Sequence, residues 1–169
     1  MNPTHIITAL EQNKEVFRHL LMNIEESEYH WRPAPGKWNL LEIVCHLHDE
    51  EIDDFRTRVK LVLETPEKPL PPFNPEAWVT ERRYSEKQYT TMLEAFITER
   101  EKSINWLRSL ENPQWGNVNE HPDAGPRSAQ LFLENWLGHD LLHMRQIIGV
   151  KFQYAEHLSE NGLSYAGKW

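Results

Sequence analysis

The chain has only one cysteine among its 169 residues, so no disulfide can form within it. It also lacks any apolar run of membrane-spanning length, and its N-terminus lacks the basic and apolar regions of a signal peptide. A chain of this length can bury a sizeable core without disulfides. We therefore expect a cytoplasmic protein with no membrane partner, folded as a single domain over residues 1–169.

Positive charge is also scarce. The 18 lysines and arginines are outnumbered by 26 acidic residues, which gives a net charge of −8. A protein that binds nucleic-acid phosphates normally carries a basic stripe, and none is visible in this sequence. We therefore expect no nucleic-acid partner and attribute the acidity to solubility.

Strand-like alternation persists nowhere, whereas helical periodicity recurs in four segments. These segments cover residues 4–24, 39–63, 85–110 and 128–149, and their predicted N-caps are Thr4, Asn39, Ser85 and Ser128. Glu42 and Gln88 stand three residues after their caps, as in a capping box, and Gly149 is expected at the end of the last helix. The sequence therefore predicts an all-α fold, a four-helix bundle.

Proline-rich connectors separate the helices. Residues 29–38 contain two prolines and a glycine between aromatic residues, and residues 64–84 contain five prolines. The second connector predicts a long, mostly extended crossover between helices two and three, of a length that often shapes or covers a site. Residues 111–127 are predicted to form a loop.

A pair of histidines, His139 and His143, lies within the fourth helix. Residues four apart share one helical face, so both imidazoles can reach one point, and imidazole is a common ligand of zinc and related metals. Trp136, Leu142 and Ile147 are spaced to bury the same general side. We therefore expect the pair to face the bundle interior, although the pair alone fits boundary histidines that bond to their neighbours.

A third metal ligand is expected from the second helix, where His46 and His48 compete. Two residues apart on a helix point in nearly opposite directions, so both cannot join one site. Spacing alone leaves the choice open. The remaining histidines have no helical partner and are assigned no function: His5, His19, His30, His121 and His157.

Polar neighbours of these histidines are candidates for supporting roles. Glu50 is a candidate general base, and Glu50 or Asp49 could accept a hydrogen bond from a histidine N–H. The alternative for both is a solvated acidic helix face. Asn135 is placed one turn before His139 and could line the cavity, and Cys45 is interpreted as a small buried residue because nothing predicts a lowered pKa.

Three motifs together resemble the DinB/YfiT-like superfamily. They read WRPxPGKW at 31–38, LEIxxHLxxxE at 41–51 and GHxxxHxxQI at 138–147. The resemblance implies a four-helix bundle, often dimeric, that binds one divalent metal, usually zinc or nickel, through three histidines. Mapped onto this chain, it favours His46 over His48 and joins it to His139 and His143.

The same resemblance implies an enzyme without fixing its substrate. Characterised relatives include bacillithiol S-transferases and mycothiol- and glutathione-dependent enzymes, and others are described as metal-dependent hydrolases. Three histidines leave a coordination position open, as in catalytic zinc sites. We expect first a metal-dependent transfer of a small-molecule thiol to an electrophile. The alternatives are hydrolysis with metal-activated water and metal binding without turnover.

Overall fold

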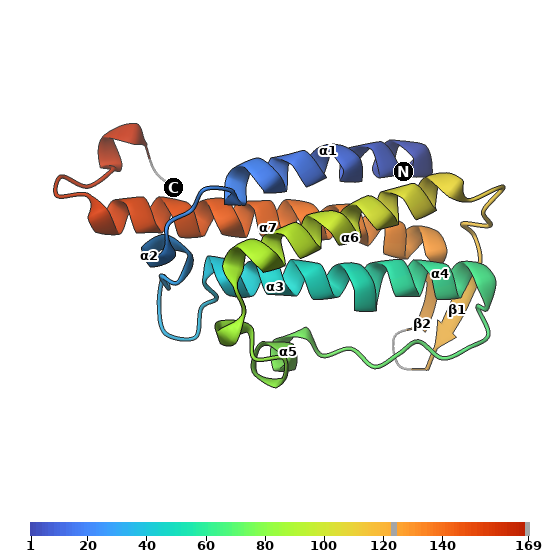
Figure 1. Cartoon of the computed structure of the whole chain (residues 1–169). Helices are drawn as coiled ribbons and strands as arrows, with labels where there is room; N and C mark the ends of the chain where they lie inside the picture. Colours follow the sequence, from blue (N-terminus) through green and yellow to red (C-terminus); the bar gives the residue numbers. More distant parts are fainter. Residues whose placement is uncertain (123–124, 168–169) are drawn as a thin grey trace.

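The computed structural model describes residues 1–122 and 125–167 and confirms the predicted all-α four-helix bundle. The long helical rods run side by side (Figure 1). They are α1 (Pro3–Leu21), the continuous run α3 (Leu40–Glu50), η1 (Glu51–Arg56) and α4 (Thr57–Glu64), then α6 (Tyr89–Ser109) and α7 (Ala129–Leu158). None of the described helices is both long and apolar enough to cross a membrane.

Short elements connect and flank the rods. They are α2 (Glu26–Tyr29), α5 (Pro75–Glu81), η2 (Tyr84–Glu86), β1 (Val118–His121), β2 (Gly125–Ser128) and η3 (Ser164–Ala166). The crossover after α4 begins with a turn at Pro66, in which the Lys68 N–H donates to the Thr65 backbone oxygen at 3.0 Å, and not with the predicted extended chain. It has no regular structure over residues 69–74 and then forms α5, which buries no residue. Asn74 caps this helix by accepting from the Ala77 N–H at 3.3 Å, and Pro75 occupies its first turn, where a missing N–H costs nothing.

The apolar core has two parts, one toward each end of the bundle. One contains Phe17 and Phe96, whose rings meet edge to face at 5.4 Å, and the other contains Phe55 stacked on Trp136 at 5.6 Å. Both parts draw on α1, the α3–α4 run, α6 and α7, which accounts for the apolar periodicity of all four segments.

A buried ion network lies between the two apolar parts. Arg100 of α6 donates to both oxygens of Asp140 on α7 at 2.7 Å and to Glu51 of η1 at 2.9–3.0 Å. These three side chains are at most 1% exposed. The indole of Trp136 also donates to Glu51, at 3.1 Å, and Asn13 of α1 donates to Asp140 at 3.0 Å. The network therefore joins all four rods at mid-height.

Two of the four predicted helix starts are confirmed. Asn39 forms the complete capping box with Glu42, and Ser128 accepts from the Leu131 N–H at 3.0 Å. The other two predictions are wrong by a few residues. Asn2, not Thr4, caps α1, and Gln88, not Ser85, caps α6 by accepting from the Thr91 N–H at 3.1 Å. In both places a neighbouring side-chain oxygen satisfies the first-turn donors instead.

The predicted end of the last helix at Gly149 is also wrong, because α7 continues to Leu158. Glycine inside a helix costs only about 1 kcal/mol relative to alanine. Ile147 and Val150, on either side of it, are buried in the core, and their packing offsets that cost.

The second helix contains a π-helical turn, η1, that its periodicity did not predict. A π turn inserts one residue into the helix and changes which side chains face inward. Glu51, Asp54 and Phe55 are all buried as a result. Such turns are frequent at functional sites.

Residues 118–121 pair with residues 125–128 as a small antiparallel hairpin, where the sequence predicted only a loop. Val118 pairs with Ser128 and His121 with Gly125. The hairpin is fastened to the crossover by the Asn119 side chain, which donates to the backbone oxygens of Pro66 and Lys68 at 2.8 and 2.7 Å. Strands of four residues are too short to show alternation, and β2 also contains glycine and proline, which have low strand propensity.

Candidate metal centre

The structure brings His46, His139 and His143 together. The Nε2 atom of His46 lies 3.2 Å from that of His139 and 3.1 Å from that of His143, and the latter two are 3.0 Å apart. One imidazole comes from α3 and two from successive turns of α7. Within the described residues this is the one group of histidine, cysteine or acidic side chains that could hold a metal ion.

Of the two histidines of α3, His46 lies beside His139 and His143 and His48 does not belong to that group. The His48 ring turns away from the cluster, and its Nδ1 lies 2.8 Å from the Asp49 carboxylate. Asp49 also accepts from the Tyr84 hydroxyl at 2.8 Å and pairs with Arg82. Asp49 is therefore part of a structural contact on another face, not of the histidine cluster.

The start of α3 is held in place by the residues of the first motif. Arg32 forms a bidentate ion pair with Glu42 at 2.5–2.6 Å and donates to the backbone oxygen of Lys37 at 2.8 Å. The connector is thereby folded against the helix start. Trp38, at its end, packs on His46 with ring centroids 4.8 Å apart.

The three imidazoles are held in the neutral form. Burial is the largest cause, and it lowers the pKa of His46 to about 3, that of His139 well below its usual value, and that of His143 in the same direction. Metal ions bind neutral imidazole, so no proton competes for these nitrogens near neutral pH.

The hydrogen-bond partner of His143 determines which of its two ring nitrogens is free to bind a metal. Its Nδ1 lies 2.8 Å from Oε1 of Gln146, and an amide oxygen can only accept. The proton is therefore on Nδ1, and the lone pair of Nε2 points into the cluster, the arrangement found for metal-bound histidines. Gln146 was noted only as part of a motif, although its three-residue spacing from His143 could have indicated this contact.

The donor geometry fits one metal ion. Zinc–nitrogen bonds of about 2.0–2.1 Å in a tetrahedral site separate the ligand nitrogens by about 3.3 Å. The observed separations of 3.0–3.2 Å lie close to this value. An ion held by these three nitrogens would keep at least one coordination position for a further ligand.

Glu50 lies directly against the cluster. Its carboxylate oxygens are 3.6 Å from Nδ1 of His46 and 4.0 Å from Nε2 of His139, and its side chain is 4% exposed. The Nδ1 atom of His46 is buried and has no hydrogen-bond partner among the described residues, although the Glu50 carboxyl lies 3.6 Å from it. Burial, followed by the charge of Asp54, raises the pKa of Glu50. The solvated acidic face considered for Glu50 is therefore wrong.

Three other expected neighbours of the site have different positions. Leu142 is exposed, so only Trp136 and Ile147 of the predicted inward side are buried. Asn135 donates to the Leu131 backbone oxygen and lines a neighbouring pocket rather than the histidine cleft. Cys45 is buried, and burial raises the pKa of its thiol to about 12, which agrees with an unreactive core residue.

The cluster opens into a cleft of about 540 Å³. Both proline-containing connectors border it: Trp38 comes from the first, and Phe73 and Pro75 come from the crossover. Phe55 forms part of the wall, with its ring centroid 5.0 Å from that of His139. A cleft of this size admits a small organic molecule.

Fold and site together define a four-helix bundle with a three-histidine cluster at the base of an open cleft. The chain belongs to the DinB superfamily, whose family model matches residues 9–147. Among solved structures it is similar to YfiT from Bacillus subtilis, described as a probable metal-dependent hydrolase with an unusual four-helix bundle topology. That likeness has a TM-score of 0.79 at 19% identity and covers 90% of this chain and 87% of YfiT. No curated protein matches the chain.

Proposed function

We propose that this protein is a divalent-metal-dependent hydrolase, with His46, His139 and His143 as the metal ligands and Glu50 as the proton acceptor. The observation that carries the proposal is the position of the Glu50 carboxylate, 4.0 Å from a cluster nitrogen and 3.6 Å from another ring. From the sequence, thiol transfer ranked first because of the family resemblance and the expected open site, and hydrolysis ranked second because no general base was evident beside the histidines. Glu50, beside the cluster, is the base that we propose for hydrolysis.

A divalent ion, zinc or nickel, would supply Lewis-acid chemistry at the three histidines and lower the pKa of a water molecule that it binds. Glu50 would take the proton from that water and return it to the leaving group. Positive charge at the cluster opposes the effect of burial on Glu50 and favours its carboxylate form. Trp38 packs on the ring of His46 and Phe55 on the ring of His139, which holds these two imidazoles in place.

A second candidate is thiol S-transfer, in which Glu50 takes the proton of a low-molecular-weight thiol before its sulfur attacks an electrophile. The observation that favours this candidate is the volume available for a second molecule beside the histidines. The histidine cleft of about 540 Å³ adjoins a pocket of about 350 Å³, so two molecules can be held together. Such an open cleft supports turnover rather than storage of a metal in a closed site.

The test compares Glu50→Gln with wild type after measurement of metal content. We expect near-stoichiometric zinc or nickel in both, and a loss of about 10²- to 10⁴-fold in turnover in the variant, because the amide cannot accept the proton. The matched control is Asp53→Asn, an equivalent change three residues later at an exposed carboxylate paired with Arg82. It should keep full activity.

Substrate panels decide between the two reactions. Activated carboxylic and phosphate esters report hydrolysis, and monochlorobimane with bacillithiol, glutathione, cysteine or coenzyme A reports S-transfer. Metal loss in His139→Ala together with loss of activity would support the shared site. Full activity of Glu50→Gln, or of metal-free wild type, would overturn the proposal.

A further inference from the structure

A second pocket, of about 350 Å³, adjoins the histidine cleft. The two share Asp54, Phe55 and Phe73 among the residues that line them. Phe55 is the link, since its ring also packs on His139 at 5.0 Å. A molecule with one end at the histidines can therefore extend past Phe55 into the second pocket.

Arg58 belongs to this pocket, but its charge is already balanced. It is buried, forms an ion pair with Asp54 and donates to the backbone oxygen of Pro71 at 3.0 Å. Its guanidinium also lies 5.2 Å from the centre of the Phe73 ring. These contacts fix one wall of the pocket and place no net charge on it.

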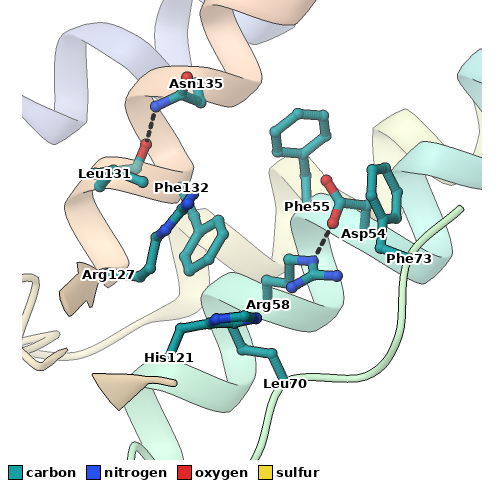
Figure 2. Close-up of a pocket in the computed structure, with 10 residues that line it drawn as sticks. All are labelled: Asp54, Phe55, Arg58, Leu70, Phe73, His121, Arg127, Leu131, Phe132 and Asn135. Carbon is teal, nitrogen blue, oxygen red and sulfur yellow. Dashed lines mark hydrogen bonds and ion pairs between the residues drawn. The ribbon is translucent and has the colours of Figure 1, made fainter. Parts of the chain in front are cut away.

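Arg127 gives the pocket its positive charge. It reaches in from β2, on the side opposite Asp54 and Arg58 (Figure 2). Its side chain forms no ion pair or hydrogen bond with any residue in the ranges 1–122 and 125–167. An arginine that faces a pocket and has no acidic partner among the described residues stands out in a chain of net charge −8.

The hairpin holds Arg127 in a defined position. Arg127 pairs across the hairpin with Asn119, which is fastened to the crossover through Pro66 and Lys68. Leu70, Leu131 and Phe132 give the pocket an apolar wall, and His121 and Asn135 also line it. A cationic fork beside an apolar wall suits a ligand with a hydrocarbon body and an anionic end.

We propose that this pocket is a recognition subsite for an oxyanion, a carboxylate or a phosphate, carried by the substrate that reacts at the three histidines. The planar guanidinium of Arg127 matches either group with two parallel hydrogen bonds. The hydrocarbon part would lie along Phe132 and Phe55 toward the metal centre. The reaction rests on the function proposed above, whereas the binding does not require it.

The test measures binding without turnover. Three probes share one aromatic body: 4-phenylbutyrate, 3-phenylpropyl phosphate and the neutral 4-phenylbutanamide. Each is titrated by calorimetry into metal-free and metal-loaded wild type and into Arg127→Gln and Arg127→Lys. The matched control is Arg145→Gln, which removes an exposed charge of α7 outside both pockets. Circular dichroism verifies that each variant is folded.

We expect at least one anionic probe to bind about tenfold or more tightly than the amide. Arg127→Gln should remove that difference, Arg127→Lys should retain part of it, and Arg145→Gln should leave it unchanged. The tighter of the two anions identifies the oxyanion, and either order supports the subsite. Equal affinity for acid and amide, no binding of any probe, or unchanged affinity in Arg127→Gln would overturn it.

The same titration in His139→Ala separates the two proposals. Charge-dependent binding that persists in this variant, while metal is lost, would support the subsite independently of the metal centre. A wild type that takes up no metal but still prefers the anionic probe would overturn the proposed hydrolase and leave the subsite standing.

Discussion

Replacement of Arg100 by methionine should be among the most damaging single changes in this protein. The substitution keeps a side chain of similar length but leaves Glu51 and Asp140, each at most 1% exposed, without their shared cation. Removing one partner of a buried ion pair costs about 3–5 kcal/mol, most of it from the uncompensated charge left behind. In urea, with a slope of about 2 kcal/mol/M, the unfolding midpoint should fall by about 2 M.

The same helix supplies the control. Arg108 pairs with both oxygens of Glu11 at 2.5–2.9 Å, so its chemistry matches that of Arg100, but its side chain is 49% exposed. Arg108→Met should cost less than about 1 kcal/mol, because solvent screens an exposed pair. The loss of stability in Arg100→Lys should fall between those of the two methionine variants. Lysine keeps the positive charge but loses the planar guanidinium that binds both carboxylates. Equal unfolding midpoints for Arg100→Met and Arg108→Met would refute the reasoning.

Three further expectations can be checked with standard assays. Cys45 should not react with Ellman's reagent in the native protein and should react fully in guanidinium, because burial and then the charge of Asp49 raise its pKa to about 12; fast native labelling would contradict this. Asn39→Ala should lower the free energy of unfolding by about 1 kcal/mol, through loss of the capping box of α3, whereas Asn74→Ala on the exposed α5 should change it less. Burial alone would raise the pKa of Asp49, but hydrogen bonds from His48 and Tyr84 and the charge of Arg82 outweigh it and lower the pKa. Because the folded pKa lies below the unfolded one, this group stabilises the protein above about pH 4, and the contribution is lost as the pH falls through the folded value. Asp49→Asn should therefore flatten the acid limb of a stability profile measured between pH 2 and 6, and an unchanged limb would contradict the assignment.

The sequence predicted the parts of this fold that rest on long periodic patterns. Four amphipathic segments define the rods because each must bury one apolar face, and prolines in the connectors exclude helix continuation. It could not predict the π turn at residues 51–56 or the pairing of residues 118–121 with residues 125–128. Both depend on contacts between distant segments: Glu51 meets Arg100, and Asn119 meets the crossover.

The candidate site, like the fold, was predictable only where it follows from helical spacing within one segment. The four-residue spacing of His139 and His143 follows from helix geometry, so their shared direction needed no structure. Spacing left His46 and His48 open, because the rotation of α3 about its axis is set by its packing on α6 and α7. The role of Glu50 was open for a related reason: four residues after His46, it could equally have faced solvent on a helix rotated outward.

The π turn η1 connects the candidate site with the buried ion network of the fold. Glu50 is the last residue of α3, and η1 begins at the next position. The wider turn allows consecutive carboxylates to serve different partners, with Glu50 against His46 and His139 and Glu51 against Arg100. In the same turn Phe55 packs on both His139 and Trp136 and forms the wall shared by the two pockets. One inserted residue thus separates the acid that faces the cleft from the acid that holds the bundle together. For this reason Glu50→Gln should impair chemistry with little loss of stability, whereas loss of Arg100, the partner of Glu51, should destabilise the whole fold.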